Sequence, residues 1–95
     1  MNGLDFSASF QIPESTLFQV SDGEAVLLSL EKETYFTLDE VGTRIWEVLQ
    51  TEKTIQETFE LLLAEYEVES EELRSDLVSF LSELLQSGLI VYRDD

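Results

Sequence analysis

The side chains that could do chemistry in this chain are almost all carboxylates. Its 95 residues include 21 Asp and Glu but no histidine and no cysteine. Histidine is the commonest general base and metal ligand in proteins, and thiolates hold most zinc and iron–sulfur sites. The acids are spread along predicted helices, as expected for solvated helix surfaces, although a metal site built from carboxylates stays possible in principle. The sequence therefore predicts no catalytic residue, no metal site and no cofactor.

The charge balance limits the partners. Five Lys and Arg face 21 acids, which gives a formal net charge of −16. Such a surface repels phosphate backbones and anionic lipids and favours a cationic or neutral partner, although acids also simply keep small proteins in solution. No apolar run approaches ~20 residues, and the N-terminus lacks the basic and apolar regions of a secretion signal. We expect a cytoplasmic protein that binds neither membrane nor nucleic acid.

The chain is organised around the segment 34–49, in which a short strand leads directly into a helix. Residues 34–38 (TYFTL) are aromatic and β-branched, which is typical of a strand. Asp39 can then accept hydrogen bonds from the first amides of a helix, and Thr37 with Glu40 offers an alternative start at capping-box spacing. Four residues continue at helical spacing: Gly42, Ile45, Trp46 and Leu49.

Two further strands are predicted before this segment. They span 18–21 and 24–31, and Asp22-Gly23 between them is a strong hairpin signal. If Leu30 pairs with Tyr35, one sheet face holds Phe18, Val20, Leu27, Phe36 and Leu38, and the other holds Val26, Leu28, Leu30, Tyr35 and Thr37. Both faces are apolar. The helices can cover one, so the N-terminal residues, a second subunit or a ligand must shield the other.

Three helices follow the sheet. They are predicted over 39–50, from Thr54 with a capping box to Glu57, and from Ser70 to about Ser87 with Gly88 as a left-handed cap. The third helix has a main apolar stripe of Leu73, Leu77, Phe80 and Leu84, and a second stripe of Val78, Leu81 and Leu85. Residues 89–92 read as a short terminal strand. Residues 1–16 form an N-terminal arm, and 17–95 form the domain.

This order of elements predicts an α+β fold of the winged helix-turn-helix type. DNA binding by that architecture needs a cationic recognition helix. The third helix instead carries one Arg74 against Glu71, Glu72, Asp76 and Glu83. Peptide binding fits better, because the strand 34–38 has a free edge to which another strand can be added. The wide apolar arc of the third helix could form the opposite wall of a groove.

Two segments resemble a known family. The residues YFTLDEVGTRIWEVL (35–49) and SGLIV (87–91) resemble PqqD-like proteins, the RiPP recognition elements, and the resemblance spans about 17–92. It implies a three-stranded antiparallel sheet packed on three helices. It also implies that the leader of a ribosomally made precursor peptide binds as a fourth strand, between the third strand and the third helix. Partner enzymes then act on the core peptide.

In its size and free-standing form, this chain is most similar to the leader-binding proteins of lasso-peptide pathways. The partners of those proteins are a separate leader peptidase and then a cyclase. The PqqD of quinone-cofactor synthesis works instead with a radical enzyme. Either resemblance implies a peptide chaperone that is not an enzyme. Three groups of residues are expected to form the site: the strand Thr34, Tyr35, Phe36, Thr37 and Leu38; the apolar wall Leu77, Val78 and Leu81; and Arg74 and Asp76, which would pair with leader charges.

Two other functions stay open. One is a winged-helix DNA-binding regulator. The other is a structural subunit that uses the free edge of strand 34–38 to form a homodimer.

Overall fold

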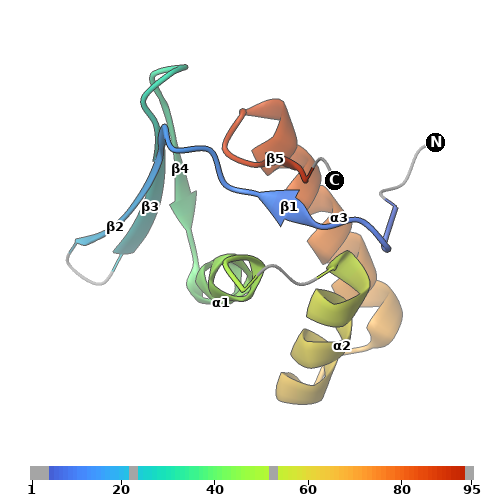
Figure 1. Cartoon of the computed structure of the whole chain (residues 1–95). Coiled ribbons are helices and arrows are strands. Elements are labelled where there is room, and N and C mark those ends of the chain that lie inside the picture. Colours follow the sequence, from blue (N-terminus) through green and yellow to red (C-terminus); the bar gives the residue numbers. More distant parts are fainter. Residues whose placement is uncertain (1–4, 22–23, 52–53, 94–95) are drawn as a thin grey trace.

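A computed structural model describes residues 5–21, 24–51 and 54–93. It has the α+β architecture that the sequence predicts, with a three-stranded antiparallel sheet, three helices and a short C-terminal strand (Figure 1). The elements are β1 (Phe10–Gln11), β2 (Thr16–Ser21), β3 (Glu24–Ser29), β4 (Thr34–Leu38), α1 (Glu40–Leu49), α2 (Ile55–Glu65), α3 (Ser70–Gln86) and β5 (Val91–Tyr92). Figure 1 shows the sheet on one side of the molecule and the helices on the other.

The sheet has the order β2-β3-β4, and its register differs from the expected one. Tyr35 pairs with Leu28, so the expected pairing of Tyr35 with Leu30 is wrong by two residues. The cause lies in the turn between β3 and β4. Lys32 donates its N–H to the Ser29 hydroxyl at 3.2 Å, and Glu33 has a φ of 55°, so the turn begins directly after Ser29. Leu30 is thus excluded from the strand and is 61% exposed.

The predicted sheet faces survive this error, because side chains alternate with a period of two and the shift is also two. Phe18, Leu27 and Phe36 are register partners on the face toward the helices, and Leu27 is fully buried there. On the opposite face Leu17 is 38% exposed and Tyr35 is 73% exposed. The predicted Asp22-Gly23 turn lies outside the described residues.

The first two helices begin where their capping residues predict. Asp39 is the N-cap of α1 and accepts the Gly42 N–H at 2.7 Å, so the alternative start at Thr37 is wrong. Thr54 and Glu57 form the predicted capping box of α2, with hydrogen bonds of 3.0 and 3.1 Å.

The residues before β2 also contribute to the start of α2. The Ile55 and Gln56 N–H groups donate to the carbonyls of Ala8 and Phe6, so this segment satisfies two of the amides that a helix start leaves free. β1 pairs with β5, and Phe10 is 2% exposed within the core. The division of the chain at residue 17 stays a prediction.

The third helix supplies much of the core. Leu77, Leu81 and Leu84 are fully buried, and α3 ends at Gln86 with Ser87 as its C-cap. Gly88 has a φ of 75°, which confirms the predicted left-handed cap. Within the described ranges, no helix has the length and apolar character needed to cross a membrane.

Replacing Thr54 with alanine tests the α2 cap. The change removes the side-chain oxygen that accepts the Glu57 N–H, and we expect a loss of about 1 kcal/mol in the free energy of unfolding. For a domain of this size that corresponds to a melting temperature lower by about 4–8 °C. Thr54→Ser keeps the hydroxyl and should melt close to the wild type. Equal losses in both variants would show that the methyl group matters and the cap does not.

Candidate functional site

The outer edge of β4 has no strand beside it within the described residues, because β4 ends the sheet and its one partner is β3. One hydrogen bond shows which residues of β4 direct their backbone groups to this outer edge. Leu30 donates its N–H to Ser15, on the β2 side, and successive residues of a strand alternate in direction. Leu27 therefore points toward β4 and bonds with its partner Phe36. It follows that Tyr35 and Thr37 direct their N–H and C=O groups to the free edge.

A groove of about 1000 Å³ lies beside the second half of β4. Phe36 and Phe80 form part of its lining and contact each other edge to face, with ring centroids 5.9 Å apart at 77°. Their contact brings α3 next to β4, and Figure 1 shows β4 as the strand of the three-stranded sheet that lies nearest to the helices. The full lining is Glu24, Phe36, Thr37, Leu38, Asp39, Glu40, Thr43, Arg44, Glu47, Tyr66 and Phe80.

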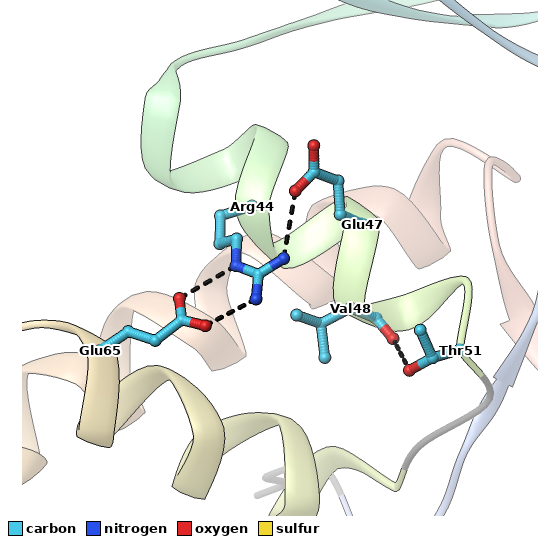
Figure 2. Close-up of polar contacts among 5 residues, drawn as sticks. All are labelled: Arg44, Glu47, Val48, Thr51 and Glu65. Atoms are coloured by element: carbon cyan, nitrogen blue, oxygen red, sulfur yellow. Dashed lines mark hydrogen bonds and ion pairs between the residues drawn. The ribbon is translucent and has the colours of Figure 1, made fainter.

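Arg44 links α1 to the end of α2 beside the groove. Its guanidinium donates to both carboxylate oxygens of Glu65, at 2.9 and 2.6 Å, and to Glu47 at 3.2 Å (Figure 2). The bonds to Glu65 and Glu47 raise the pKa of Arg44, and the same contact with Arg44 lowers the pKa of Glu65. The contact therefore stabilises at neutral pH and is lost as the pH falls through the lowered pKa of Glu65. Because Glu65 ends α2, the bond also holds the adjacent Tyr66 near α1.

The predicted strand residues lie together along this edge. Phe36, Thr37 and Leu38 line the groove. Thr34 and Tyr35 belong to the same strand and are exposed, but they lie outside the groove lining. Of these five residues, Tyr35 and Thr37 direct their backbone groups to the free edge, whereas Thr34, Phe36 and Leu38 direct theirs toward β3.

The predicted helix residues are not brought together. Leu77 and Leu81 are fully buried in the core, so neither is on the surface of the free protein. Arg74 and Val78 line a second hollow of about 580 Å³, which is formed by residues of α3 alone. The Arg74 guanidinium lies 4.0 Å from the ring centre of Phe6. Asp76 is exposed and lines neither hollow.

Phe80 is the α3 residue that lines the groove, although its helical spacing predicted a place in the core stripe. Residues two apart on a helix point in nearly opposite directions, so Phe80 and Val78 occupy opposite flanks of the buried stripe. Both flanks are apolar, and the sequence contains no signal that distinguishes them. Tyr66, which directly follows α2, is partly exposed and also lines the groove.

Comparison with known proteins places the groove within a matched region. Residues 24–90 match the family described as coenzyme PQQ synthesis protein D (PqqD), which includes β3, β4 and all of the helices. No curated protein matches the chain.

Two solved structures are similar over nearly their whole length. The first, "TbiB1 in Complex with the TbiA(beta) Leader Peptide", is 36% identical, with a TM-score of 0.78 over 90% of this chain and 99% of that chain. The second, "Lasso peptide synthetase B1 complexed with the leader peptide", is 23% identical, with a TM-score of 0.78 over 88% of this chain and 99% of that chain, and shows the same fold. The family match covers well over half of the residues, and so this chain belongs to the PqqD family.

Proposed function

We propose that this protein binds the leader segment of a ribosomally made precursor peptide by strand addition to β4. Within residues 34–38, the outward-facing backbone groups of Tyr35 and Thr37 supply hydrogen bonds, and side chains of the leader enter the groove between β4 and α3. The protein itself performs no chemical step in this proposal. It delivers the bound peptide in the cytoplasm, where precursors are synthesised, to a separate leader peptidase of a lasso-peptide pathway.

The free edge of β4 beside an aromatic groove is the observation that carries this proposal. Tyr35 and Thr37 present backbone groups that no strand among the described residues pairs, and Phe36 and Phe80 offer apolar surface beside them. An added strand gains affinity from its main chain and selectivity from pockets for alternate side chains. The 36% identical TbiB1 forms a complex with a leader peptide, which supports the same use of this fold here.

Amide hydrogen exchange tests strand addition directly. The TbiA(β) leader peptide is a defined first probe, and peptides selected from a random display library are a second. The Tyr35 and Thr37 amides should exchange fast in the free protein and at least about tenfold more slowly when peptide is bound, because they become hydrogen-bonded. Selected peptides that bind while both amides keep exchanging fast would contradict the proposal.

Alanine substitutions on the two flanks of α3 identify which one meets the peptide. Phe80→Ala removes a groove wall, and we expect peptide binding to weaken about tenfold or more, as for a central aromatic contact. Val78→Ala is the matched control, since Val78 is also partly buried but lies in the second hollow. It should change the dissociation constant less than about twofold, within the range of peripheral contacts. Calorimetric titration measures both, and the reverse order would assign the peptide to the Val78 flank.

The partner enzyme distinguishes two pathways that share this fold. A lasso-peptide pathway supplies a separate leader peptidase, whereas quinone-cofactor synthesis supplies a radical enzyme. The fold that this chain shares with a lasso peptide synthetase B1 supports the first, and the name of the matching family keeps the second as an alternative. Co-purification of the tagged protein with each candidate enzyme, with and without leader peptide, separates the two.

Two other uses of the fold compete with peptide binding. A DNA-binding regulator is disfavoured, because α3 carries exposed Glu71, Glu72, Asp76 and Glu83 against a single basic residue, Arg74. A homodimer could use the same β4 edge as the peptide. Light scattering decides this point: a dimer that dissociates when peptide is added would show that self-association and peptide compete for one edge.

A further inference from the structure

The groove beside β4 is more acidic than binding of an apolar side chain requires. One guanidinium, that of Arg44, contributes to its lining, against four carboxylates: Glu24, Asp39, Glu40 and Glu47. In residues 5–21, 24–51 and 54–93, no three acidic side chains are grouped so that they could hold a metal ion. The negative charge at the groove is therefore available to a cationic group of another kind.

Two of the four carboxylates are free to meet such a cation. The Glu47 carboxylate already accepts a hydrogen bond from Arg44, whose guanidinium also binds Glu65 outside the groove lining. The Asp39 carboxylate caps α1 by accepting the N–H of Gly42. Glu24 and Glu40 are exposed, and none of the hydrogen bonds or ion pairs of the described side chains engages them. They come from the start of β3 and the start of α1, so they approach the groove from two elements.

The aromatic part of the lining suits a long cationic side chain. Lysine and arginine bury their methylene groups against apolar surface while the charged end reaches a polar rim. Phe36, Tyr66 and Phe80 offer that surface, and aromatic faces also attract cations. A net charge of −16 on the whole chain further draws cationic peptides toward the protein.

We propose that the groove selects a lysine or arginine side chain of the bound peptide, held between the aromatic walls with its charge at Glu24 and Glu40. This inference rests on the proposed function, because the peptide reaches the groove as a strand added to β4. It narrows the substrate class to extended peptides with a basic residue near the end of the added strand.

Selection from a random display library tests the proposal without knowledge of the natural precursor. The library is selected on the wild type, on Glu24→Gln/Glu40→Gln and on Glu14→Gln/Glu71→Gln. The last variant loses the same net charge at exposed positions outside the groove lining. Peptides selected on the wild type and on the control variant should carry a lysine or arginine at a fixed distance from their own apolar residues. Peptides selected on the groove variant should show no such preferred position.

Affinities of one selected peptide give the quantitative form of the test. Changing its basic residue to glutamine should weaken binding to the wild type about fivefold, the upper range for a solvent-accessible ion pair, and leave binding to the groove variant unchanged. The loss should shrink as salt is raised. Thermal melts check that the exposed Glu→Gln changes leave the fold intact.

The outcomes separate this inference from the function on which it rests. Peptides that bind at the β4 edge without a preferred basic position, or with the same preference in both double variants, overturn the inference and leave strand addition standing. Peptides that bind equally well after the edge of β4 is blocked by proline overturn the proposed function, and the inference with it. Loss of the basic position in the groove variant alone supports both.

Discussion

Replacing Leu81 with glutamate is expected to unfold the protein rather than to block peptide binding selectively. Leu81 is fully buried among Leu77, Leu84 and the rest of the core, so the change removes apolar packing and introduces an unpaired carboxylate. These effects together should cost more than about 4 kcal/mol. Small domains have a free energy of unfolding near the lower end of about 5–15 kcal/mol. Circular dichroism and the fluorescence of buried Trp46 should therefore show a largely unfolded variant.

Val78→Glu is the matched control for this substitution. Val78 lies on the same helix, is partly exposed and borders the second hollow near Arg74. A carboxylate there stays in water, so the variant should fold with a loss of at most about 1 kcal/mol. A folded Leu81→Glu protein with a nearly unchanged melting temperature would instead place Leu81 in an open groove wall, as predicted from the sequence.

Proline at the outer edge of β4 is expected to abolish strand addition while the protein stays folded. Tyr35 and Thr37 direct their N–H groups away from β3, so Tyr35→Pro or Thr37→Pro removes a donor that the folded protein does not use. Edge strands tolerate proline on that side. The lost hydrogen bond and the clash of the ring with an incoming strand should weaken peptide binding at least about tenfold per substitution. Fluorescence anisotropy with a labelled selected peptide measures the change.

Two controls separate the backbone from the side chain. Thr37→Val keeps the N–H group and should bind peptide within about twofold of the wild type, because strand addition depends mainly on the main chain. Phe36→Pro removes a donor directed toward Leu27 and should destabilise the sheet itself by about 3 kcal/mol or more. If Thr37→Pro and Tyr35→Pro both fold and bind normally, the peptide does not use this edge.

Local features of the fold were predictable from the sequence because neighbouring residues determine them. The side chains of Asp39 and Thr54 accept hydrogen bonds from amides three positions ahead, so both helix starts were predicted. Gly88 ends α3 because glycine adopts a positive φ without steric cost. Strand 34–38 was recognisable by composition, and the sheet faces by their period of two.

Features that depend on distant residues were decided by the tertiary structure. The turn after β3 is an exception, because it is local: the Ser29 hydroxyl accepts the N–H of Lys32 three residues ahead and places Leu30 outside the strand. No glycine marks this polar turn, and the predicted register was therefore wrong by two residues. Pairing of β1 with β5 joins the two ends of the chain, and neither short strand carries a periodic pattern of its own.

The side of α3 that faces β4 is the clearest example of a feature that only the tertiary structure decided. Leu77 with either Phe80 or Val78 gives an apolar flank, so helical spacing allows both orientations. Packing decided between them. The Phe80 ring meets Phe36, and a Cβ on Gly42 would lie 3.3 Å from that ring, so the small residue in α1 leaves room for Phe80. A helix buries the flank for which its neighbours leave space, and that space exists only after the sheet and α1 have come together.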